Sequence, residues 1–137
     1  MPDLALANQG SYIISSSSYD EDYPPENMID GNIKTYFVTT GMFPQEFVIG
    51  FSSTVKIDKI NLVSYNIKGI QIEKSATGQC DDFILVAEYK LDHSAGNYTN
   101  SEFPVKNCNA THLKFIITGG YDHFICIQKI AVHGNVA

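Results

Sequence analysis

Short apolar runs separated by turn residues recur along the whole chain. The runs are five to eight residues long and rich in Ile, Val, Phe and Tyr, with Gly, Asn, Asp, Ser and Pro between them. This spacing is typical of strands, and no segment gives an extended apolar helical face. We expect strands at Tyr12–Ser15, Tyr36–Thr40, Phe47–Ser52, Val55–Tyr65, Lys68–Glu73, Phe83–Tyr89, His112–Ile117 and Phe124–His133.

In one of these runs, VKIDKINLVSY at residues 55–65, the apolar residues switch from one face of the expected strand to the other. Val55 and Ile57 alternate with polar residues, and Ile60 and Leu62 alternate again with the opposite parity. A side-chain period of two changes phase where a strand carries an extra residue, so the sequence predicts a bulge or bend near Asp58-Lys59.

The strand spacing also predicts the class of fold. Eight short strands, with loops expected at Ser15–Pro25 and Ser94–Thr99, favour an all-β, antiparallel β-sandwich, and a jelly roll is one arrangement that fits. At 137 residues the chain is the length of one domain, which we expect to span residues 1–137.

Charge limits the classes of partner. The net charge is −6, all nine basic residues are lysines, and the chain has neither arginine nor tryptophan. Nucleic acids and anionic membranes are bound through basic patches, so neither is an expected partner. No apolar run is long enough to span a bilayer, so we expect no membrane insertion.

The cysteines and the first residues indicate a compartment. Cys80, Cys108 and Cys126 are widely spaced and form no CxxC pair, so a disulfide framework or zinc site is not expected. The N-terminal stretch has neither the basic nor the apolar region of a secretory signal. We therefore expect a protein of the reducing cytoplasm.

A segment rich in carboxylates suggests a cation site. Five acids and no base lie between residues 20 and 30, and the pattern N-x-x-D-G-N-x-x-T follows at residues 27–35. It supplies the Asp30 carboxylate, the Thr35 hydroxyl and carbonyl oxygens at a turn that Gly31 permits, all of which suit calcium. The alternative is that Asp30-Gly31 is only a turn beside a solvated acidic face.

No residue set predicts catalysis. Cys126 near Asp122-His123, or Cys80 with His123, could pair a thiol with a base, but Cys126 lies in an apolar run where a buried, inert thiol is usual. Asp81 and Asp82 could be considered as paired acids for glycoside hydrolysis, but adjacent residues of an extended chain point to opposite faces. We expect no catalytic residues and no enzyme.

Four segments carry a resemblance to a known family. They are PPENMIDGNIKTYFVTTGMFPQEFVIGF at residues 24–51, QIEKS at 71–75, LKFIITGGYDHF at 113–124 and AVHGNV at 131–136. Together they resemble the subunit twenty-five family of the intraflagellar transport B complex, once grouped with small heat-shock proteins. The resemblance implies an eight-stranded jelly roll of the galactose-binding-like, discoidin type, without catalysis. It also implies a heterodimer with a Rab-like small GTPase, contacts with other complex B subunits, and export of signalling components from the cilium or flagellum.

The resemblance further implies a structural calcium ion. Related jelly rolls bind calcium in the matching loop, and their ligand positions correspond to Asn27, Asp30, Asn32, Thr35 and the Val132 carbonyl. His133 replaces the acidic residue that often completes this set, and neutral imidazole is a poor calcium ligand beside a carboxylate. Phe37 occupies a position where this fold often has tryptophan.

The partner surface is less defined. Met42 and Phe43 are candidate partner-binding residues because interface cores favour Met and aromatic side chains over charged ones. The alternative is that this apolar loop tip folds back on the core. The other function common on this fold is a calcium-dependent carbohydrate- or lipid-binding module, for which the missing Trp and Arg make the chain a poorer match.

Overall fold

The computed structural model describes residues 4, 10–18, 21–32, 34–40, 42–76, 83–91, 98–121 and 124–136, with only the main chain described at 106 and 107. Several residues singled out above lie outside these ranges: Asp20, Cys80, Asp81, Asp82, Asp122 and His123. No described helix is long and apolar enough to cross a membrane.

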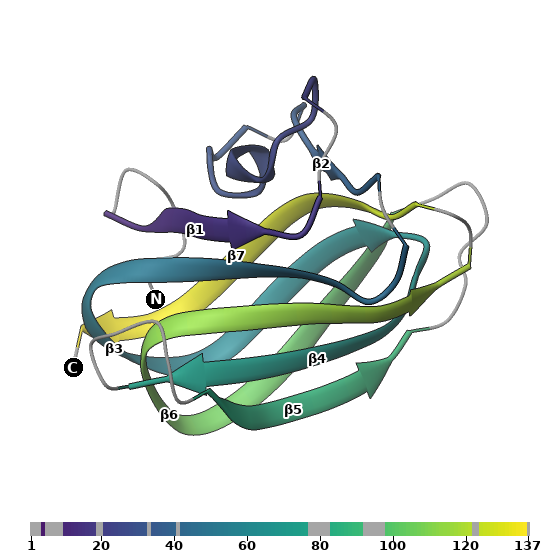
Figure 1. Cartoon of the computed structure of the whole chain (residues 1–137). Coiled ribbons are helices and arrows are strands. Elements are labelled where there is room, and N and C mark those ends of the chain that lie inside the picture. Colours follow the sequence, from purple (N-terminus) through teal and green to yellow (C-terminus); the bar gives the residue numbers. More distant parts are fainter. Residues whose placement is uncertain are drawn as a thin grey trace.

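The described chain is an antiparallel β-sandwich (Figure 1). Its elements are β1 (Tyr12–Ser16), the short 3-10 helix η2 (Pro25–Met28), β2 (Phe37–Val38), β3 (Gln45–Tyr65), β4 (Ile67–Ser75), β5 (Ile84–Lys90), β6 (Thr99–Gly120) and β7 (Cys126–Val136). The prediction of an all-β, antiparallel sandwich is confirmed. The described residues form seven strands rather than eight, because two predicted strands are one.

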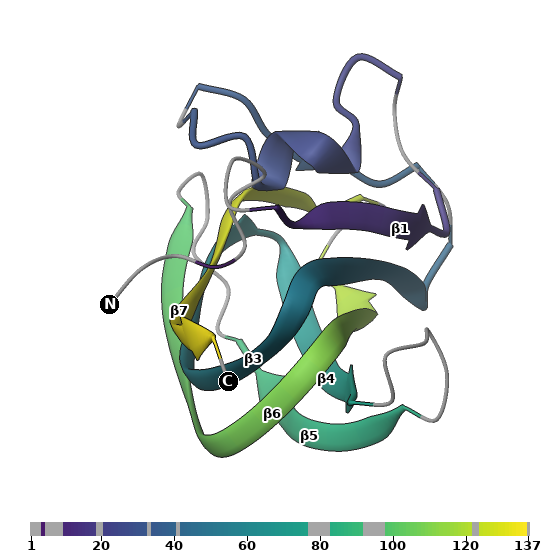
Figure 2. The same cartoon turned by 90° about the vertical axis from the view of Figure 1, so that its left-hand side faces the viewer.

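Two long strands run through both layers of the sandwich. In the front sheet, the first part of β3 and the last part of β6 pair at the centre, with β1 on one side and β4 and β5 on the other. In the back sheet, the last part of β3 lies between β7 and the first part of β6, and β2 borders β7. Figure 2 shows β3 and β6 curving together from one layer into the other.

The bend of β3 corrects the predicted strands at 47–52 and 55–65. Its pairing with β6 breaks between Gly50 and Val55 and then continues, so the two predicted strands are one bent strand. The bulge predicted near Asp58-Lys59 is confirmed, because the register of β3 with both β6 and β7 shifts between Ile57 and Lys59.

Strand β6 begins at Thr99 rather than at the predicted His112. Its first half is rich in polar residues and contains Pro104. Proline is disfavoured in a central strand because it lacks the amide hydrogen that a neighbouring strand would bind. Among the described residues that half pairs with β3 alone, so it is an edge, where a missing amide hydrogen is tolerated.

The core lies between the two sheets and is aromatic at its centre. The rings of Phe47 and Phe115 stack with centroids 5.1 Å apart, and Phe37 meets Phe47 edge-on at 5.7 Å. All three side chains are fully buried. Phe37 follows the candidate calcium loop in the chain, and its buried ring anchors the end of that loop to the core.

Candidate functional site

The segment from Pro24 to Tyr36 caps one side of the sandwich. Pro25 opens η2, where its missing amide hydrogen would have had no partner, and the amide of Asn27 donates to the Pro24 carbonyl at 3.1 Å. Met28 and Ile29 are buried, so they anchor the loop to the core. The polar residues that follow are held at the surface above this anchor.

Three predicted ligand residues converge on the hydroxyl group of a fourth, Thr35. The Thr35 Oγ1 atom lies 2.6 Å from Asp30 Oδ2, 2.9 Å from the Asn32 carbonyl oxygen and 3.3 Å from the Asn27 carbonyl oxygen. The other carboxylate oxygen of Asp30 accepts a hydrogen bond from the Asn32 amide at 2.8 Å. Gly31 provides the turn between them with a φ of 77°.

The fifth predicted ligand lies on a neighbouring strand. Val132 belongs to β7, against which η2 packs, and its carbonyl accepts a hydrogen bond from the Leu4 amide at 2.7 Å. His133, the next residue, is partly exposed and sits opposite Lys59 of β3. The loop residues are therefore hydrogen-bonded to one another, whereas the Val132 carbonyl is hydrogen-bonded to Leu4.

The donor types discriminate between metals. Within the described ranges, no group of three or more His, Cys, Asp and Glu side chains could hold a metal ion. The converging atoms are instead two carbonyl oxygens, one carboxylate and one hydroxyl. Oxygen donors of this kind suit a hard cation such as calcium and not zinc or copper.

A pair of tyrosines beside this loop was not anticipated from the sequence. The rings of Tyr23 and Tyr36 stack with centroids 4.7 Å apart and an interplanar angle of 14°. A hydrogen bond with Tyr23 raises the pKa of Tyr36 to about 12. The Asn27 side chain donates to the Tyr36 carbonyl at 3.0 Å, which ties the pair to the loop.

The two predicted partner-binding residues point in different directions. Met42 is 88% exposed. Phe43 is partly buried and packs against the core, where its ring tip would come within 2.7 Å of a Cβ atom at Gly120. The loop therefore combines the two alternatives: Met42 faces outward, and Phe43 folds back.

The described cysteines lie in settings that disfavour the thiolate. Cys108 and Cys126 are free and buried. Burial raises the pKa of the Cys108 and Cys126 thiols. A thiol nucleophile needs the opposite shift.

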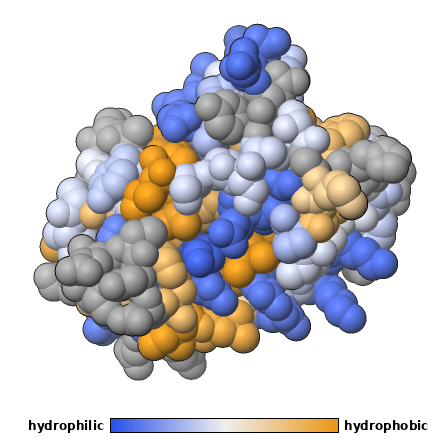
Figure 3. Space-filling view, viewed as in Figure 1, coloured by the Kyte–Doolittle hydropathy of each residue, from blue (hydrophilic) through white to orange (hydrophobic). Residues whose placement is uncertain are grey.

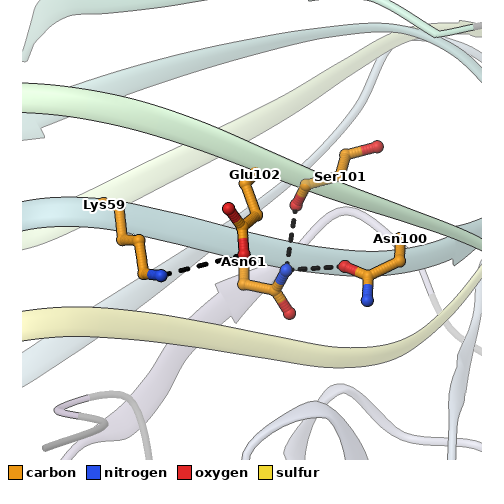
Figure 4. A network of polar contacts seen from close by, with 5 residues as sticks. All are labelled: Lys59, Asn61, Asn100, Ser101 and Glu102. Carbon is orange, nitrogen blue, oxygen red and sulfur yellow. Dashed lines mark hydrogen bonds and ion pairs between the residues drawn. The ribbon is translucent and has the colours of Figure 1, made fainter. Parts of the chain in front are cut away.

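A polar network covers part of the outer face of the back sheet (Figure 4). The Asn61 side-chain amide donates to Asn100 Oδ1 at 2.6 Å and to the Ser101 carbonyl at 3.2 Å, and Lys59 pairs with Glu102 at 3.7 Å. These contacts join β3 to the edge half of β6. The ion pair is solvent-exposed, so it contributes at most about 1 kcal/mol.

Comparison with known proteins places this architecture in a family. The model of the F5/8 type C domain matches residues 13–130. The human "Intraflagellar transport protein 25 homolog" is 42% identical over 134 residues, covering 98% of this chain and 93% of that protein. "Intraflagellar transport protein 25" of Chlamydomonas reinhardtii is 37% identical over 135 residues, covering 98% of this chain and 71% of that protein.

A solved structure supports the fold. CpGH89CBM32-5 from Clostridium perfringens, determined in complex with GalNAc-β-1,3-galactose, superposes with a TM-score of 0.83 at 19% identity, covering 97% of this chain and all of that one. At this identity the likeness concerns the fold alone. Because its relatives are 37% to 42% identical over 98% of its length and it carries the F5/8 type C domain, the chain belongs to the intraflagellar transport protein 25 family.

Proposed function

We propose that this protein is a non-enzymatic subunit of the intraflagellar transport B complex, working in the cytoplasm and in the cilium or flagellum. The observation that carries the proposal is the 37% to 42% identity to intraflagellar transport protein 25 over nearly the whole chain. The raised pKa values of the Cys108 and Cys126 thiols agree with a binding role rather than nucleophilic catalysis.

The proposed partner is a Rab-like small GTPase, with which the chain forms a heterodimer that supports export of signalling components. The exposed side chain of Met42 supports an interface at this loop, because interface cores are enriched in methionine and aromatic residues. The Phe43 ring, packed against the sandwich, would hold the loop in a fixed position for docking.

Co-expression with the Rab-like GTPase, followed by size-exclusion chromatography, tests the heterodimer. We expect one co-eluting peak, and two separate peaks at about micromolar concentration would overturn the proposal. Met42→Asp should weaken binding by about tenfold or more, since it buries a charge at the interface. Ile84→Asp, on the exposed surface of β5, is the matched control and should leave the complex intact.

We further propose that the loop binds a structural calcium ion through Asn27, Asp30, Asn32, Thr35 and Val132. The Thr35 hydroxyl has one proton, yet three oxygen atoms lie within 3.3 Å of it. A cation among these oxygens would satisfy the lone pairs that the single proton leaves free. Bound calcium would tie the loop to β7, and with Asp30 as the one carboxylate of the set its affinity would be moderate.

A further inference from the structure

A cleft lies in the front sheet, away from the candidate calcium loop. Its volume is about 590 Å³, and it lies between the start of β4, the ends of β5 and β6, and the loop that precedes β3. Figure 3 shows hydrophilic and apolar side chains next to one another at the end of this face where β5 ends. Neither the proposed calcium site nor Met42 contributes to its lining.

Glycines form the floor of the cleft. Gly69 of β4 pairs with Lys90 of β5 on one side and with Gly119 of β6 on the other. A Cβ atom at Gly119 would meet nothing within 4 Å, and one at Gly69 would lie 2.4 Å from Thr118 Oγ1. The floor is therefore bare main chain with the Thr118 hydroxyl lying across it, so a ligand can approach the sheet closely.

The charged lining is cationic on balance. Lys68 and Lys90 both line the cleft and are exposed, and the Lys68 ammonium lies 6.0 Å from the centre of the Tyr121 ring. Glu88 is the one carboxylate among the lining residues, and it accepts a hydrogen bond from the Gln71 side chain. Two ammonium groups against one engaged carboxylate form a local positive site on a chain whose net charge is −6.

One wall of the cleft is apolar. Phe43 lies against Gly120 at the side opposite β5, and Tyr89, whose ring stacks on Phe103 at 4.3 Å, supports the β5 side from the core. Because these rings are held by packing, the wall is preformed. Preformed pockets with an apolar wall and a few convergent polar groups are typical of small-molecule sites.

We propose that this cleft binds a small molecule in which an anionic group, carboxylate or phosphate, is joined to an apolar body. The anion would lie between Lys68 and Lys90 over the glycine floor, and the apolar body would lie against Phe43. Thr118 can donate a further hydrogen bond to the anion. The cleft shares Phe43 with the loop proposed to dock the GTPase, but its lysines, Lys68 and Lys90, lie outside that loop and Met42 lies outside the cleft, so either proposal can fail alone.

Titration of the ¹⁵N-labelled full chain with phenyl phosphate and with benzoate tests the proposal by NMR. We expect saturable shifts of the Gly69, Gly119 and Gly120 amides with millimolar Kd values, and the tighter of the two probes identifies the preferred anion. Benzyl alcohol, which has the ring without the charge, should bind about tenfold more weakly or worse, because charge-assisted hydrogen bonds are lost.

Variants locate the site. Lys68→Ala and Lys90→Ala should each weaken phenyl phosphate binding by about tenfold. Lys59→Ala, which removes a lysine from the back sheet, is the matched control and should not change it. Gly119→Val should block the cleft while the spectrum stays that of a folded protein, since its Cβ enters open space.

Three results would overturn the proposal. One is the absence of saturable shifts up to about 20 mM of either anion. Another is benzyl alcohol binding as tightly as phenyl phosphate, which would show that charge has no role. The third is unchanged phenyl phosphate binding to a folded Lys68→Ala, Lys90→Ala double variant.

Discussion

The Thr35 hydroxyl lies 2.6 Å from Oδ2 of Asp30, five residues earlier in the chain. This short contact closes the loop into a ring around Gly31, and it brings the one carboxylate of the proposed ligand set next to the carbonyl oxygens of Asn27 and Asn32. The same arrangement that stabilises the loop also groups the oxygen donors that calcium would need.

Calcium should stabilise the protein through Asp30. At a hundredfold excess of calcium over its Kd, the free energy of unfolding should rise by about 2.7 kcal/mol, measured as a higher Tm than in chelator. Asp30→Asn should abolish this rise, whereas Asp58→Asn, an exposed carboxylate of β3, should retain it. A wild-type Tm that does not respond to millimolar calcium would contradict the site.

A matched pair of glycine variants tests the packing of β7 on β3. A Cβ atom at Gly134 would lie 2.0 Å from the Lys56 carbonyl oxygen, so Gly134→Ala must push the strands apart and should cost about 2 kcal/mol or more. Gly119→Ala enters open space and should change stability by less than about 0.5 kcal/mol. Urea denaturation measures both, and equal losses would refute this account.

Truncation of Phe43 should lower stability much more than truncation of Met42. Phe43→Ala removes a ring packed on Gly120 and should lower the free energy of unfolding by about 1–3 kcal/mol. Met42→Ala, at a side chain that is 88% exposed, should have an effect within about 0.5 kcal/mol. Chemical denaturation of the isolated chain decides, and a large loss for Met42→Ala would mean that its side chain packs on the fold.

The buried thiols should make stability fall at alkaline pH. Burial raises the folded-state pKa of Cys108 and Cys126, so folding favours the neutral thiol. This contribution is complete below the pKa of an unfolded thiol, about 8.5, and is lost as pH rises through the raised folded value. The urea concentration at the unfolding midpoint should therefore be lower above the raised folded-state pKa than below the unfolded-state pKa.

Thiol reactivity gives a second readout of the same burial. In a Cys80→Ser background, Cys108 and Cys126 should react with a disulfide reagent slowly in the native protein and fast in urea. Rapid labelling of either residue in the native state would contradict their burial.

The predicted strands are marked by apolar runs. The first half of β6 was missed because its buried residues, such as Phe103 and Val105, stand singly between polar residues and Pro104. In the first half of β6 the polar side chains Asn100 and Glu102 face solvent in the network with Asn61 and Lys59. Its membership of the sheet depends on pairing with β3, which is far away in the chain. The continuity of β3 between Gly50 and Val55 was missed for the same reason, since it shows only in the pairing of both parts with β6.

Local spacing indicated a possible cation loop, because the Asp30 carboxylate and the Thr35 hydroxyl lie five residues apart beside the turn at Gly31. The oxygens of Asn27, Asp30 and Asn32 do lie within 3.3 Å of that hydroxyl, and calcium at this loop stays a prediction. The glycine-floored cleft could not be predicted in this way. Its floor joins Gly69 to Gly119 through the pairing of β4 with β6, and neither glycine has a local signature.

The course shared by β3 and β6 has a kinetic consequence. Their paired residues are separated by 35 positions at Ser64–Thr99 and by 72 at Gln45–Ile117, and each layer contains one half of this pair. Neither layer can therefore assemble ahead of the other from local contacts. Because such distant pairings are entropically slow to close, we expect the chain to fold slowly, and both layers to be acquired in the same rate-limiting event.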